Sequence, residues 1–91
     1  MTLYSLPAKV SHENVQSVLS EGMALLANIQ ANGSLNIDCQ KLDIFDSSAL
    51  SIILAIKRQA QKKVISIQLQ AVPEKLASLA KVYGVADIVL S

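Results

Sequence analysis

The sequence predicts a small α/β domain: a mixed, mainly parallel sheet with helices packed mostly on one face. Segments that alternate apolar and polar residues, as half-buried strands do, take turns along the chain with segments of helical three-and-four spacing. Such an order favours parallel strands joined by helical crossovers. The chain has 91 residues, so we expect residues 1–91 to form a single domain with one core.

Residues that typically begin or end regular elements flank the first predicted strand and the first predicted helix. Leu3 to Leu6 is rich in apolar residues and is followed by Pro7, which indicates a strand end or an edge strand. Ser11 is placed as the N-cap of the helix, and Asn32-Gly33 is its stop signal. The apolar face of this helix comprises Val15, Val18, Leu19, Gly22, Met23, Leu26 and Ile29.

Two later strands share one pattern. Leu35 to Cys39 and Val64 to Leu69 both alternate apolar with polar residues. Each strand therefore has one face for helices and one for water, which predicts helices mainly on one side of the sheet.

Two more helices are predicted. The helix from Asp46 to Gln61 has a broad apolar stripe and is strongly buried. Pro73 opens the last helix at its first position, Gly84 ends it, and Tyr83 lies on its core-facing side. The apolar tail 85–90 has no distinguishing period, and we expect a turn followed by a short strand.

Composition excludes several functions. The formal net charge is +1, which argues against binding to nucleic acid or to anionic lipid. Cys39 is the single cysteine, so neither an intramolecular disulfide nor a cysteine-based zinc site is expected, and a reducing cytosol is the simpler location. The longest apolar run, 52–56, is far shorter than the ~20 residues that span a bilayer. Any membrane association should therefore go through a partner.

The segment Asp46-Ser47-Ser48 is the candidate site, because it lies where a strand meets the buried helix. With Asp46 as N-cap, both serine hydroxyls would lie near backbone N–H groups that lack helical partners. A phosphoryl group on Ser47 would be stabilised there and would add ~1.5–2 negative charges to an interface. The same three residues are also an ordinary capping sequence, and both interpretations stay open.

No catalytic constellation is predicted. His12 is the only histidine and has no nucleophile beside it in the sequence. Asp38, Asp43 and Asp46 fall on a strand, a loop and a cap, without sign of a shared pocket. No glycine-rich loop, metal-ligand cluster or cofactor motif is present, so we expect no enzyme and no cofactor. Tyr83 is expected in the core, with an interface position for its hydroxyl as the alternative.

The stretch from Asp46 to Leu50, with the strand before it and the helix after it, resembles the STAS domains, and the resemblance covers nearly the whole chain. The usual STAS motif is Asp-Ser-Ser/Thr-Gly-Leu, and its first hydroxyl residue is the phosphorylation site in anti-sigma factor antagonists. Ser47 matches that position. Ala49 stands where glycine is typical, which adds a methyl group at the start of the helix without abolishing the cap.

Two branches of that family then compete. Residues 79–90 look like the ending of MlaB-type subunits of bacterial Mla phospholipid ABC transporters. This resemblance implies a non-catalytic cytoplasmic subunit, peripheral to the inner membrane, that supports the ATPase subunit in maintaining outer-membrane lipid asymmetry. Asp46, Ser47 and Ser48 would then contact the ATPase. The alternative is an anti-sigma factor antagonist that binds a kinase, although Pro7 to Val10 lacks the acidic residue usual there.

Overall fold

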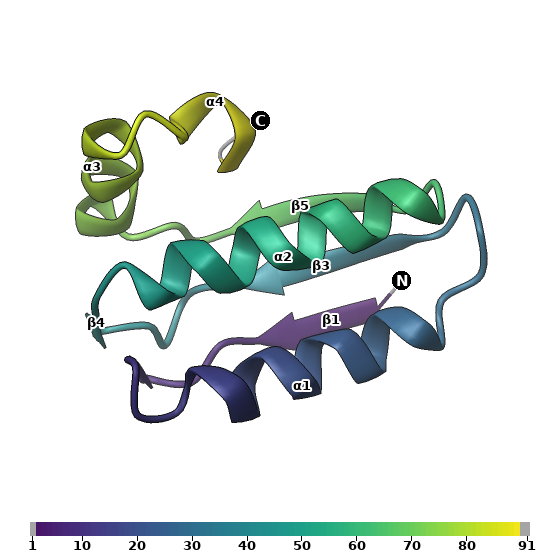
Figure 1. Ribbon diagram of the computed structural model, residues 1–91, viewed down its shortest axis with the longest axis horizontal. Coiled ribbons are helices and arrows are strands. Elements are labelled where there is room, and N and C mark those ends of the chain that lie inside the picture. The colour runs from purple at the N-terminus through teal and green to yellow at the C-terminus, as the bar shows by residue number, and fades with distance from the viewer. Residues whose placement is uncertain (1, 90–91) are drawn as a thin grey trace.

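The structure, a computed structural model, describes residues 2–89. The predicted alternation of strands and helices is confirmed (Figure 1). The elements in chain order are β1 (Thr2–Ser5), β2 (Lys9–Val10), α1 (Val15–Ala27), β3 (Ser34–Asp38), β4 (Ile44–Phe45), α2 (Ser48–Lys62), β5 (Ser66–Gln70), α3 (Glu74–Val82) and α4 (Ala86–Val89). Within the described residues, no helix is long and apolar enough to cross a bilayer.

The main sheet has three parallel strands in the order β1-β3-β5. Tyr4 pairs with Ile37, and Ile37 pairs with Leu69, so these three side chains form one row facing the helices. The neighbouring row is Leu3, Asn36 and Gln68, which faces away from the helices. The alternation along β3 and β5 thus sorts apolar from polar side chains, as the sequence predicted.

Helices α1 and α2 lie side by side over one face of this sheet, and α3 and α4 lie beyond β5 (Figure 1). The core forms between α1, α2 and the sheet, and Leu35, Ile37, Ile53 and Ile56 in it are fully buried. Lys63, just after α2, donates from Nζ to the carbonyls of the last turn of α1, at 3.1 and 3.4 Å. The partial negative charge there favours a cation.

The strands β2 and β4 were not predicted, because each has only two residues. β2 and β4 pair in parallel and make a second, two-stranded sheet. They follow β1 and β3, which also pair with each other, so this small sheet continues the main one beyond its carboxyl edge. A two-residue segment has no measurable period, so the sequence alone does not predict either strand.

The start of α1 corrects the predicted cap. The helix begins at Val15, after Asn14, and Ser11 lies in a preceding turn instead of at the N-cap. The backbone N–H of Ser11 donates to Asn14 Oδ1 at 2.9 Å, and the Ser11 hydroxyl accepts from the N–H of Glu13 at 3.3 Å. The serine therefore stabilises a local turn, a role that serine favours as much as capping.

The C-terminal third also departs from expectation. Pro73 is extended (ψ 145°) and immediately precedes α3, so it is the N-cap and not the first helical residue. Gly84 ends this region with φ 73°, as predicted. The tail forms helix α4 instead of a strand, and Leu90 lies outside the described residues. Val64 has φ 57°, which places it in a turn and starts β5 at Ser66, two residues later than expected.

Tyr4 makes the stability of the fold depend on pH in the alkaline range. Its hydroxyl donates to the carbonyl of Val18 on α1 at 2.9 Å, and its side chain is buried. Burial, and secondarily the charge of Glu21, raises the pKa of Tyr4 from 10.0 to about 12. The folded state therefore favours the neutral phenol, and this stabilisation is complete below about pH 10 and is lost as the pH rises towards about 12.

We expect the unfolding free energy of the wild type to fall by about 2 kcal/mol more than that of Tyr4→Phe between about pH 9 and about pH 12. Urea unfolding at the two pH values measures this difference. Cys39, whose thiol pKa burial raises to about 11, is present in both proteins, so its titration cancels. Equal losses in the two proteins would show that Tyr4 is not held neutral by the fold.

Candidate functional site

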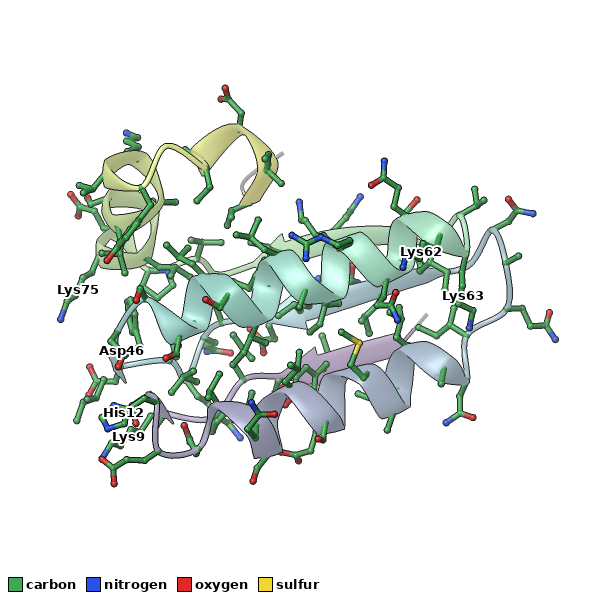
Figure 2. All side chains as sticks on the ribbon, in the orientation of Figure 1. Lys9, His12, Asp46, Lys62, Lys63 and Lys75 are labelled. Atoms are coloured by element: carbon green, nitrogen blue, oxygen red, sulfur yellow. The ribbon has the colours of Figure 1, made fainter. Side chains whose placement is uncertain are left out.

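The candidate site lies at the N-terminal end of α2, where β4 and the turn before α1 meet (Figure 2). The β2–β4 ladder fixes this meeting. The N–H of Ile44 donates to the carbonyl of Ala8 at 2.9 Å, and the N–H of Asp46 donates to that of Val10 at 3.3 Å. Asp46 is thereby held beside the turn that contains His12.

Ser47 is the N-cap of α2 and makes no side-chain capping hydrogen bond, so the predicted N-cap, Asp46, lies one residue before it. Asp46 Oδ1 accepts from the backbone N–H of Ser48 at 2.8 Å, although the regular helix begins only at Ser48 and follows Ser47 directly. The hydrogen bond from the Ser48 N–H, then that from its hydroxyl, holds the pKa of Asp46 below its usual value. His12 Nδ1 lies 3.9 Å from Asp46 Oδ2 and adds to this effect when protonated. No pattern in the sequence predicted that His12 and Asp46 lie together.

Ser47 and Ser48 differ in exposure. The side chain of Ser47 is exposed, and that of Ser48 is partly buried. The carbonyl of Ser47 accepts from the N–H of Ser51 at 3.1 Å and from its hydroxyl at 3.4 Å, which closes the first helical turn. Ala49 is buried, so the methyl group at this position is accommodated in the core. Of the three predicted site residues, Asp46 and Ser47 are therefore the ones open to a partner.

A small hollow of about 230 Å³ adjoins Ser47. The hollow forms because the junction of α3 and α4 closes over the first half of α2. Its lining consists of Ser47, Leu50, Ser51, Leu54, Tyr83 and Val85. Tyr83 is 58% exposed, which overturns its predicted core position and agrees with the interface alternative.

The lining of the hollow has aliphatic side chains, two serine hydroxyls and the Tyr83 phenol, and contains no carboxylate, imidazole or amine. The volume of the hollow is below the ~300–1,000 Å³ usual for small-molecule sites. Asp38 and Asp43, the other carboxylates considered in the sequence, are not part of its lining. In the region from 2 to 89, no three histidine, cysteine, aspartate or glutamate side chains group as metal ligands.

Apolar side chains are exposed around the same end of the molecule. Ile44 on β4 is 62% exposed, and Val82 on α3 is 81% exposed. β4 and α3 both lie at the end where α2 begins (Figure 1). Lys75 on α3 lies 5.5 Å above the ring of Phe45, a cation–π contact that connects the two elements. Exposed apolar residues around a hollow are typical of a protein-binding surface.

This arrangement of sheet and helices is the STAS fold. The structure of the anti-sigma factor antagonist SpoIIAA in its unphosphorylated form is similar, with a TM-score of 0.74 over 93% of this chain and 73% of that one, at 13% identity. The family model for the MlaB STAS domain matches residues 5–90, and the chain therefore belongs to the STAS domain family. No curated protein matches the chain.

Proposed function

We propose that this chain is the non-catalytic cytoplasmic subunit of a bacterial phospholipid ABC transporter of the Mla type. It binds the ATPase subunit through the N-terminal end of α2 and supports assembly and activity of the complex. The match to the family model for the MlaB STAS domain supports the choice of transporter. The membrane is then reached only through the complex, peripheral to the inner membrane.

The observation that carries this proposal is the exposed Ser47 at the rim of a small hollow with a mixed polar and apolar lining. A serine side chain is small, so a partner can approach the backbone of α2 closely at this point. An apolar side chain of the ATPase would fill the space between Leu54 and Tyr83, and the rim around it would exclude water. Asp46 would meet the partner from the side, with its carboxylate already engaged by Ser48.

A role in lipid asymmetry follows from the complex and not from direct chemistry. The hollow beside Ser47 is lined by aliphatic, serine hydroxyl and phenol groups and is suited to contact with a protein side chain. The subunit would instead stabilise the ATPase in its assembled form. Binding free energy from this surface is what would favour that form over the free subunit.

The second candidate is an anti-sigma factor antagonist controlled by phosphorylation. The similarity to SpoIIAA supports the shared fold, and the exposed hydroxyl of Ser47 at the start of α2 is the feature that favours this role. A phosphoryl group there would place ~1.5–2 negative charges beside the ionised Asp46 and would repel an acidic partner surface. The partner would be an anti-sigma factor kinase.

One pull-down distinguishes the two functions. Wild type and Ser47→Glu are used in parallel as bait on native cytosolic and membrane fractions, and the captured proteins are identified by mass spectrometry. We expect wild type alone to recover an ABC ATPase together with its permease. Recovery of a small serine kinase would establish the antagonist, and recovery of the ATPase by both baits would remove Ser47 from the interface.

A further inference from the structure

One edge of the main sheet is open along β5. The N–H of Ser66 donates to the carbonyl of Gly33, and the carbonyl of Gln70 accepts from the N–H of Cys39 at 2.9 Å. In a parallel ladder, alternate residues turn both backbone groups to the same neighbour. Residues 66, 68 and 70 therefore face β3, while the N–H and C=O groups of Ile67 and Leu69 point outwards from the sheet.

This edge lacks the features that usually prevent strand pairing. Exposed edges are commonly protected by charged side chains, prolines or very short strands. β5 has the sequence Ser-Ile-Gln-Leu-Gln over five residues, with neither a charge nor a proline. The opposite edge strand, β1, has four residues. Both edges turn two residues outwards, Leu3 and Ser5 on β1 and Ile67 and Leu69 on β5, so the number of outward groups does not distinguish them.

A hollow of about 820 Å³ runs beside this edge. It is formed by β5, the second half of α2 and helix α4. Lys57 Nζ donates to the carbonyl of Ile88 at 2.6 Å, which ties α4 to α2 across the hollow. The lining residues are Lys57, Gln61, Ile65, Ser66, Ile67, Gln68, Leu69, Asp87 and Ile88. The open edge therefore lies within a recess of the size of a ligand site.

We propose that this recess binds an extended polypeptide segment of a partner protein, which adds to β5 as a fourth strand. The alternating outward groups of Ile67 and Leu69 specify an extended backbone as the ligand, because only a strand matches their spacing. A second copy fits less well, since its own β5 would bring its α2 and α4 into the same space. A single extended segment has no helices attached beside it and avoids this overlap.

The environment also specifies the side chains of the segment. On the helix side, residues of the segment would meet Ile67, Leu69 and the 56% exposed side chain of Ile88. On the opposite side they would lie beside Ser66 and Gln68. The segment should therefore alternate apolar with polar residues.

This second surface is separate from the Ser47 end of the molecule. Lys57 and Gln61 are in the later turns of α2, and Lys57 is ten residues, or roughly 15 Å of helix, beyond Ser47. The two surfaces could hold two partners, or two parts of one partner, at once. Failure of the proposed transporter role would leave this proposal intact.

The test begins with selection of binders from a displayed library of random linear dodecapeptides on the immobilised protein. An enriched peptide is then synthesised and titrated into isotope-labelled protein, and amide hydrogen exchange is followed by NMR. We expect enriched sequences that alternate apolar and polar residues. Exchange at Ile67 and Leu69, fast in the free protein, should slow at least about tenfold on binding, because new hydrogen bonds must open first.

Matched variants locate the binding. Ile88→Glu, at an exposed position in the wall of the recess, should weaken the peptide at least about tenfold by placing a charge against its apolar face. Ile44→Glu, equally exposed but outside the recess, and Ser47→Arg should both bind within about twofold of wild type. The proposal is overturned if no sequence is enriched. It is equally overturned if the peptide shifts Leu50 and Tyr83 while Ile67 and Leu69 exchange unchanged.

Discussion

Ser47→Arg should lower the affinity for the transporter ATPase at least about 100-fold, whereas Ser47→Ala should stay within about threefold. The serine contributes little surface of its own, so removing its hydroxyl removes little. Arginine would bury an unpaired charge at the rim of the hollow in the complex and would block entry to it. Each tenfold loss corresponds to about 1.4 kcal/mol, so the predicted effect is about 2.8 kcal/mol or more.

The folded domain should tolerate the same change. Ser47 is exposed and immediately precedes α2, so the arginine side chain extends into solvent in the free protein. Ser20→Arg, at an exposed position on α1, is the matched control for added charge. Calorimetric titration against purified ATPase measures affinity, and circular dichroism with a thermal melt measures folding. If Ser47→Arg unfolds the domain, or binds as tightly as Ser20→Arg, Ser47 does not belong to the interface.

The architecture could be predicted because its main elements are long enough to show a period. Leu35 to Cys39 alternates cleanly, and the apolar stripe of α2 is continuous over four turns. The errors concern segments whose structure depends on tertiary contacts. β2 and β4 are defined only by pairing with each other, and the tail after Gly84 is helical because it packs beside α2 and α3. No local sequence pattern indicates either the β2–β4 pairing or the packing of α4.

The candidate site divides in the same way. A hydrogen bond from the start of α2 to Asp46 was predictable, because an aspartate before a helix commonly accepts from the free backbone N–H groups there. The hollow beside Ser47 was not, since it needs Tyr83 and Val85 from the far end of the chain against Leu54. The approach of His12 to Asp46 depends likewise on the pairing of β2 with β4. Local chemistry was visible in the sequence, and the shape around it was not.

Of all the substitutions proposed for this protein, we expect Gly22→Val to lower the free energy of unfolding most. Gly22 is buried on α1 where that helix meets α2. A Cβ atom there would lie 2.7 Å from Ile56 Cδ1 and 3.4 Å from Tyr4 Cε2. Valine would add two further methyl groups, at a cost of about 3 kcal/mol. A domain of 91 residues has only roughly 5–14 kcal/mol in total, so the melting temperature should fall by about 10–20 °C.

A double-mutant cycle isolates the contact that causes this loss. Gly22→Ala improves helix propensity by about 1 kcal/mol but strikes Ile56 Cδ1, the one atom that Ile56→Val removes. Gly22→Ala with Ile56→Val should therefore be more stable than the sum of the single changes by about 1 kcal/mol, measured by urea unfolding. For Gly22→Val, the control is Ala24→Val at an exposed position on α1, which measures the effect of a β-branched residue in this helix without the contact to Ile56. The close approach of Gly22 to Ile56 is expected to position α2 against α1. Additive effects of the two substitutions would show instead that other contacts position α2.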